Sequence, residues 1–169
     1  SYRKGCAGGP AAIRKALFSG AMNGWTEGGR ELDFSNTIQW ADGPKLRRAR
    51  DPHNRIREEV HRWLEEGKVP VVLGGDHSVT WPVVQALAER ERALDILHFD
   101  AHPDLYHAYD GNPLSHGSPF ARIMEAGGCA RLVQVGIRGD TGHQREQARR
   151  FLVETIEMRN INPDLCLSF

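Results

Sequence analysis

DILHFDAHPDLYHAYDGNPLSHG, residues 95–117, is the stretch that decides the fold. An apolar run over Leu94–Phe99 is followed at once by three polar residues at every second position: Asp100, His102 and Asp104. If Leu94–Phe99 forms a strand, side chains two positions apart point to the same face. The three polar side chains would then share one face for as long as the strand continues. Open parallel α/β sheets place their chemistry at the carboxyl ends of their strands, so the stretch predicts a functional site there.

The three side chains favour a divalent metal site over an ordinary polar loop. Two carboxylates and an imidazole this close together would repel and lose hydration unless a positive group joins them. Oxygen ligands with an imidazole suit Mn²⁺, with Zn²⁺, Fe²⁺ and Co²⁺ as competitors. His98 shares the parity but lies inside the apolar run, so we interpret it as a core residue or as a hydrogen-bond partner of the ligands.

A second polar cluster follows the apolar run Val69–Leu73, which predicts a strand covered on both faces. The glycine pair 74–75 allows a sharp turn, and an expected helix follows with Ser78 as its N-cap. His77 lies between this strand end and the helix start. A lone histidine there is most often structural, but its position at a second strand end favours a metal ligand.

Helical and strand patterns alternate from residue 51 onward. Asp51 is a good N-cap, Pro52 suits a first helical turn and Gly67 is a typical helix stop. Further helices are expected over 11–18, 118–125 and 144–151, and further strands over 131–137, 154–158 and 165–169. Such alternation predicts the α/β class, with a parallel sheet and helices on both faces.

Composition limits the possible functions. The 169 residues are enough for one domain, 1–169, and 22 basic residues balance 22 acidic ones, so no positive field predicts a nucleic-acid partner. No apolar run approaches the roughly 20 residues that span a bilayer, so no membrane partner is expected. The cysteines Cys6, Cys129 and Cys166 are far apart and odd in number, which favours a reducing compartment and a cytoplasmic location.

Three motifs occur in the order and spacing of the ureohydrolases, the family of arginases and agmatinases: GGDH at 74–77, FDAHPD at 99–104 and SHGSPFAR at 115–122. GCAGGPAAIR at 5–14 and LVQVGIR at 132–138 agree with that order. The chain is most similar to the agmatinase-like branch that includes plant-type arginases. The resemblance implies an arginase-like fold of three layers, α-β-α, around a mainly parallel sheet.

The resemblance also implies a role for each polar side chain of the motifs. His77 and Asp104 would bind the first of two Mn²⁺ ions and His102 the second, and Asp100 would bridge both. His116 would be catalytic as a proton shuttle, which suits a side chain that titrates near neutrality.

The polar loop between these motifs is expected to contact the substrate, as exposed loops beside a site often do. It would recognise the non-reacting end of the substrate, with Asn112 and Ser115 as the predicted substrate-binding residues.

The implied activity is manganese-dependent hydrolysis of a small guanidino compound, agmatine or L-arginine, to urea and an amine. A hydroxide that bridges two cations would attack the guanidino carbon, and a general acid would protonate the departing amine. Related C–N hydrolases, namely guanidinobutyrase and formimidoylglutamase, stay open as alternatives, and so does an inactive metal-binding chain. A homo-oligomer is expected.

The chain departs from the family pattern at its ends. It stops at Leu167-Ser168-Phe169, where the third metal-binding motif of the family should begin. We therefore expect two metal-binding aspartates to be missing, the sheet to be incomplete at both ends and the 169-residue chain alone to be inactive.

Overall fold

The computed structural model describes residues 5–33, 38–44, 51–91 and 94–161. Its helices are α1 (Gly9–Leu17), α2 (Pro52–Glu65), α3 (Thr80–Arg90), α4 (Pro119–Glu125) and α5 (Gly142–Arg150). Its strands are β1 (Asp95–Phe99), β2 (Arg131–Ile137) and β3 (Glu154–Glu157). Short 3₁₀ turns cover Cys6–Gly8, His77–Val79 and Met158–Asn160.

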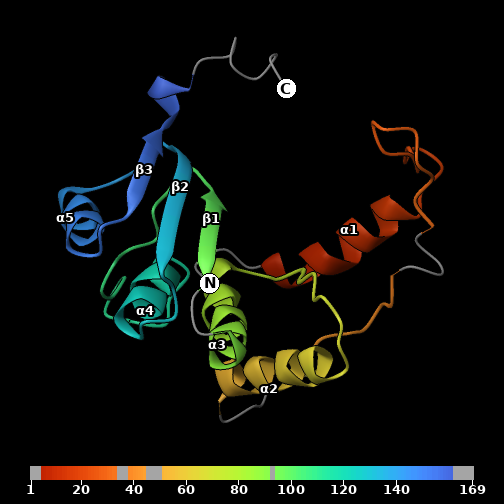
Figure 1. Cartoon of the computed structure of the whole chain (residues 1–169), viewed down its shortest axis with the longest axis horizontal. Coiled ribbons are helices and arrows are strands. Elements are labelled where there is room, and N and C mark those ends of the chain that lie inside the picture. Colours follow the sequence, from red (N-terminus) through yellow and green to blue (C-terminus); the bar gives the residue numbers. More distant parts are fainter. Residues whose placement is uncertain (1–4, 34–37, 45–50, 92–93, 162–169) are drawn as a thin grey trace.

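The three strands form a parallel sheet in the order β1-β2-β3 (Figure 1). Helix α4 connects β1 to β2, and α5 connects β2 to β3, as parallel pairing requires. The predicted α/β class is therefore confirmed, together with these three strands. The strand predicted over 165–169 lies outside the described residues.

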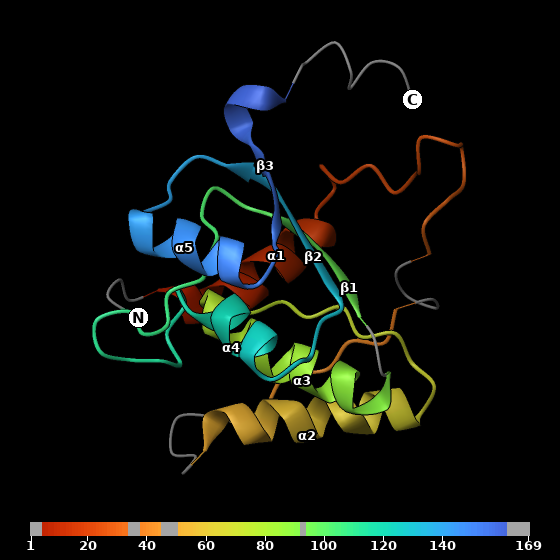
Figure 2. The ribbon, with the colours of Figure 1, turned by 60° about the vertical axis from the view of Figure 1, so that its left-hand side comes forward.

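Helices α3, α4 and α5 supply the side chains that pack on one face of this sheet (Figure 2). β1 and β2 turn alternate residues toward them, which is the period of an extended strand. The shared core includes Val84 of α3, Phe120 and Ile123 of α4, Leu132 of β2 and Ala148 of α5. Full burial of each large apolar side chain contributes about 1.5–3 kcal/mol, so this layer holds the three helices on the sheet.

The opposite face of β1 carries exposed apolar side chains. Leu97 is 59% exposed and Phe99 is 71% exposed. Their neighbours Ile96 and His98 point toward the helices and are half-buried and buried. An apolar strand face of this kind is built to be covered, since exposed apolar patches on soluble proteins usually mark contact surfaces.

The strand predicted over Val69–Leu73 is wrong. The segment takes part in no ladder among the described residues, and Val69 and Val71 are 90% and 85% exposed. Apolar composition favours extended backbone, but a strand also needs a hydrogen-bonded neighbour, and sequence alone does not supply one.

Helix α2 begins and ends as predicted. The carboxylate of Asp51 accepts a hydrogen bond from the backbone N–H of Asn54 at 3.0 Å, and Pro52 occupies the first turn. Gly67 has a φ of +72°, the left-handed conformation that ends helices. α2 packs on α3 through Val60 and Leu64. Among the described residues, no helix is long and apolar enough to cross a membrane.

Candidate metal centre

A tight turn ahead of α3 positions His77. The side chain of Asp76 accepts hydrogen bonds from the backbone N–H of Ser78 at 3.0 Å and from its hydroxyl at 2.5 Å. Asp76 is therefore the cap of this turn, and the prediction that Ser78 is the N-cap is wrong. A Cβ atom on Gly74 would lie 2.5 Å from Cγ2 of Val79, so a larger residue there would force Val79 or the backbone to shift.

A loop that starts where β1 ends positions the other polar residues. The backbone N–H of Asp100 still donates to the carbonyl of Val135 at 3.1 Å, which extends the ladder by one bond. The carboxylate of Asp100 then accepts from the backbone N–H of His102 at 2.9 Å, and Asp104 has a φ of +50°. The alternation of side chains along the strand therefore ends at Phe99. A turn, and not a continued strand, brings the side chains after Phe99 together.

The structure brings imidazole and carboxylate groups from both loops into contact. Nδ1 of His77 donates to Oδ2 of Asp104 at 2.5 Å. Nitrogen and oxygen atoms of His77, His98 and Asp100 lie within 4.8 Å of one another, a group that could hold a metal ion among the described residues. Imidazole nitrogens and carboxylate oxygens at such separations are a donor set that fits a divalent metal.

His102 lies at the edge of this cluster. Its Nδ1 is 3.5 Å from Oδ1 of Asp100, and its side chain is 61% exposed. A Cβ atom on Gly139 would lie 2.8 Å from Cδ2 and 3.0 Å from Nε2 of His102. Gly139 therefore leaves the space that the His102 ring occupies.

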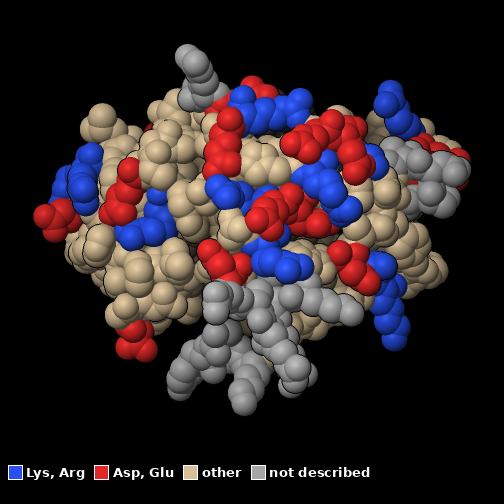
Figure 3. Space-filling view, turned by 90° about the horizontal axis from the view of Figure 1, so that it is seen from below, with Lys and Arg blue, Asp and Glu red and all other residues tan. Residues whose placement is uncertain are grey.

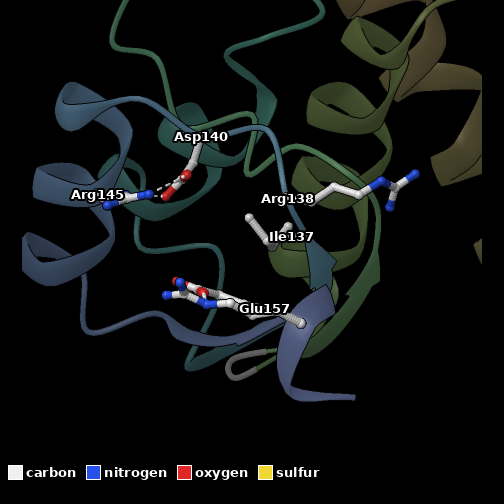
Figure 4. A pocket seen from close by; sticks show the side chains of 6 residues that line it. Ile137, Arg138, Asp140, Arg145 and Glu157 are labelled. Carbon is white, nitrogen blue, oxygen red and sulfur yellow. Dashed lines mark hydrogen bonds and ion pairs between the residues drawn. The ribbon is translucent and has the colours of Figure 1, made fainter. Parts of the chain in front are cut away.

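An ion pair fixes the loop that contains Gly139. Nε and Nη2 of Arg145 donate to the carboxylate of Asp140 at 2.6 and 2.9 Å, a two-point contact between the loop and α5 (Figure 4). Hydrogen bonds from Arg145 lower the pKa of Asp140. The pair lines a shallow pocket together with Ile137, Arg138, Glu157 and Arg159, and Arg138 points away from it.

The cluster shifts the pKa values of its members in opposite directions. Burial alone would lower the pKa of His77, but the hydrogen bond and charge of Asp104 and the charges of Asp100 and Asp76 raise it. Burial, together with the charge of His77, lowers the pKa of His98. Burial would raise the pKa of Asp100, but the His102 backbone bond and nearby histidines lower it.

His116 is exposed and lies on the loop between β1 and α4. Its ring packs edge-on against Tyr109, with ring centroids 5.3 Å apart. Burial raises the pKa of Asp76, but hydrogen bonds from Ser78 and the charge of His116 are among the influences that lower it overall. The role of His116 beside the proposed metal ligands stays a prediction.

The two predicted substrate-binding residues differ in exposure. Asn112 is exposed, and its side-chain oxygen accepts from the backbone N–H of Leu114 at 2.9 Å. Ser115 is buried, and its hydroxyl lies 2.9 Å from that of Ser118. Ser115 thus holds the loop together in this structure, and the substrate contacts of both residues stay predictions.

Sequence reasoning missed both Gln134 and Phe120. Gln134 is fully buried, and its amide nitrogen reaches the carbonyl of Pro103 at 2.7 Å and Nδ1 of His98 at 3.1 Å. The ring of Phe120 lies 4.2 Å from that of His98 and 5.6 Å from that of His77. The available signal was a single polar residue at an inward position of the otherwise apolar run Leu132–Ile137.

Charged side chains outside the cluster are mixed in sign. Acidic and basic residues are interspersed over the face drawn in Figure 3, in line with the equal totals of 22 each.

The chain matches the Arginase family over residues 1–166. The mitochondrial arginase of Medicago truncatula is 46% identical over 97% of this chain and 51% of that protein. The agmatinase of Bacillus anthracis is 35% identical over 88% of this chain and 51% of that protein. The chain thus spans about half the length of the curated relatives it matches.

Two solved structures show the same fold. The arginase from Medicago truncatula superposes with a TM-score of 0.89 at 44% identity, over 98% of this chain and 55% of that one. The formimidoylglutamase from Bacillus subtilis gives a TM-score of 0.77 at 25% identity, over 91% of this chain and 50% of that one. The predicted arginase-like fold is therefore confirmed.

The expectation of a cytoplasmic location is wrong. Plant relatives from Medicago truncatula, Oryza sativa and Arabidopsis thaliana are named as mitochondrial arginases. The expectation came from the number of cysteines, which indicates only whether a compartment is reducing. Because several compartments are reducing, this number does not identify one of them. The family itself follows from the match over residues 1–166 and from the arginase fold: this chain belongs to the arginase family.

Proposed function

We propose that the protein hydrolyses a small guanidino compound to urea and an amine in a manganese-dependent reaction. The observation that carries the proposal is the gathering of His77, Asp100 and Asp104 at the carboxyl end of β1, in a chain of the arginase family. Since the chain spans about half the length of its curated relatives, the activity is proposed for a protein of their length.

The residues present would supply part of the ligand set for a pair of Mn²⁺ ions. His77 and Asp104 would hold one ion, His102 the other, and Asp100 would contact both. Carboxylates with imidazoles suit Mn²⁺, and the cluster lies at a strand end where oxygen and nitrogen atoms already converge. When bound, two such ions supply a water of lowered pKa as the nucleophile for a resonance-stabilised guanidinium.

The protein's own side chains would move the proton that the reaction needs. The departing amine must be protonated, and His116 is proposed to deliver this proton because it is exposed on the loop beside the turn of His77. Asn112, exposed on the same loop, is proposed to bind the non-reacting end of the substrate. Ser115 would contribute through the shape of the loop or through the same substrate contact.

L-arginine is the first substrate to test and agmatine the second. The plant arginase relative is 46% identical over 97% of the chain, whereas the bacterial agmatinase is 35% identical over 88%. Formimidoylglutamate hydrolysis is the competing reaction, which the TM-score of 0.77 with a formimidoylglutamase supports. We further propose that the 169-residue chain alone releases little urea and that the complete protein is a homo-oligomer.

The test is a product assay on a protein that spans the length of the relatives. The protein is loaded with Mn²⁺ and offered L-arginine, agmatine, 4-guanidinobutyrate and N-formimidoylglutamate separately. Urea from arginine or agmatine supports the proposal, and formamide from N-formimidoylglutamate alone assigns the competing reaction.

A matched pair of variants separates this activity from that of a host enzyme. Asp100→Asn removes the proposed bridging carboxylate and should abolish product formation. Asp95→Asn changes the same residue type at the exposed opposite end of β1 and should leave the rate unchanged. Equal rates from the two variants, or no product from any of the four compounds, would contradict the proposal.

A further inference from the structure

Gln134 connects β2 to the loop that carries the metal-binding residues. It is opposite His98 in the register of β1 and β2, and its side chain is fully buried. Its amide nitrogen lies 2.7 Å from the carbonyl oxygen of Pro103 and 3.1 Å from Nδ1 of His98. A single buried side chain therefore contacts the strand before Asp100 and the loop after it.

The chemistry of Pro103 fixes the orientation of the Gln134 amide. A carbonyl oxygen can only accept a hydrogen bond, so the NH₂ group of Gln134 must face it. The opposite orientation would place two oxygen atoms against each other at this separation. Because the NH₂ group has two hydrogens, the second one is free to point at Nδ1 of His98.

The amide in turn fixes the tautomer of His98. Nδ1 receives a hydrogen bond from Gln134 and so must carry a lone pair, and the single N–H of the neutral ring is then on Nε2. Nε2 is buried without a hydrogen-bond partner within ordinary reach, and Oδ2 of Asp100 lies 3.6 Å away. The N–H of His98 therefore faces the carboxylate of Asp100.

This tautomer decides between two roles for His98. With a proton on Nε2 and Nδ1 occupied by Gln134, the ring has no lone pair to offer the cluster, although its atoms lie within 4.8 Å of donor atoms of His77 and Asp100. His98 can instead direct its N–H toward Asp100, as histidine and amide partners often do behind metal ligands.

We propose that Gln134 is a positioning residue, which sets the Nε2–H tautomer of His98 and thereby orients the carboxylate of Asp100 for metal binding. Its consequence for catalysis rests on the proposed function, whereas the tautomer does not. Gln134 also holds the carbonyl of Pro103, so one side chain fixes both the loop and the direction of the carboxylate.

Long-range ¹H–¹⁵N NMR spectra of the histidine rings test the tautomer in the metal-free chain at a pH where the ring is neutral. The His98 signals are assigned by their loss in His98→Asn. The native chain should show the Nε2–H pattern. Gln134→Glu replaces a donor with an acceptor, and it should shift His98 toward the Nδ1–H pattern. Gln134→Met, of similar volume, should give a mixture of both.

Gln147→Met is the matched control. Gln147 is another buried glutamine, 5% exposed, but it lies on α5 and contacts Arg150. The control should keep the Nε2–H pattern of His98. It separates the loss of this particular hydrogen bond from the general cost of a buried polar substitution.

A metal titration tests the second half of the proposal. In a protein of the relatives' length, Gln134→Met should weaken Mn²⁺ binding roughly 10–100-fold, the usual effect of removing a partner behind a metal ligand. Gln147→Met should not change the affinity. Unchanged affinity in Gln134→Met, with a folded spectrum, would show that Asp100 does not depend on this network.

The outcomes for the two proposals differ. An Nδ1–H pattern in the native chain overturns the role of Gln134, whatever the protein does with guanidino compounds. An Nε2–H pattern and weakened Mn²⁺ binding, with no hydrolysis by the native protein, overturn the proposed function and leave the positioning role intact. If the Gln134 variants do not fold, the native spectrum still decides the tautomer.

Discussion

Nδ1 of His77 lies 2.5 Å from Oδ2 of Asp104, although 27 positions separate the two residues in the chain. One residue comes from the turn before α3 and the other from the loop after β1. The contact joins the two motifs that the sequence presents separately.

Replacing His77 should remove a metal ligand without unfolding the protein. We expect His77→Asn to weaken Mn²⁺ binding in a protein of the relatives' length by more than about 10²-fold, the upper range for residues that only support a ligand. Isothermal titration measures the affinity. His53→Asn, a change in the first turn of α2, is the control and should bind normally. Normal binding by His77→Asn would remove this residue from the ligand set.

The stability of the metal-free chain should depend on pH through His77. Its pKa is raised from the ordinary 6.5 in the folded state, mainly because the hydrogen bond and charge of Asp104 outweigh burial. A group whose pKa is raised by folding stabilises the folded state fully at any pH below its pKa in the unfolded chain. This stabilisation is lost as the pH rises through its pKa in the folded chain. The pair should therefore stabilise the chain most below about pH 6.5.

Urea unfolding of the native chain and of His77→Gln, both with EDTA, measures this contribution. The difference in free energy of unfolding between the two should be largest at pH 6 and should shrink as the pH rises to 9. A difference that grows with pH would mean that His77 is neutral in its contact with Asp104.

His116 should affect the rate and not the metal content. We expect His116→Asn to lower kcat by roughly 10²–10⁴-fold, the usual contribution of a positioned acid or base. Added imidazole should restore part of the rate. Metal analysis of the purified variant serves as the check on the role, because loss of an ion would make His116 a ligand. An unchanged rate would direct attention to His107 on the same loop.

Gly139→Ala should disturb His102 selectively. The added Cβ would lie 2.8 Å from Cδ2 of the His102 ring, so the ring or the backbone must shift. We expect one of two Mn²⁺ ions to bind at least about tenfold more weakly, as after loss of a supporting contact. Gly142→Ala is the control because a Cβ there meets nothing within 4 Å. Two equally tight ions in Gly139→Ala would place His102 outside the metal site.

Local pattern was enough to predict β1, β2, β3 and α2. β1 and β2 each have an apolar run of strand length, and α2 has the cap Asp51 and the stop Gly67. β3 is short and half acidic, and its β-branched residues Thr155 and Ile156 favour a strand. The segment Val69–Leu73 has an equally apolar pattern and forms no ladder among the described residues. Pairing depends on what lies beside a strand, and that information is not local.

The proposed metal-binding residues could be named from motifs, whereas the contacts that support them could not. His77, Asp100 and Asp104 were named from sequence, and the structure brings them together. The role of Gln134 depends on a contact with His98, 36 positions away, which no local pattern encodes. The space at Gly139 for His102 likewise appears only when the loop after β2 packs against the loop after β1.

The pairing of β1 with β2 also sets the order in which the parts of this site form. On a growing polypeptide, His77 and Asp104 are synthesised well before Gln134, which must close a segment of 36 residues to reach His98. Closing such a segment costs chain entropy before any contact repays it, so it comes late in folding. A nascent chain therefore contains His77, Asp100 and Asp104 before Gln134 can contact His98, so the support of this loop forms after the residues that it supports.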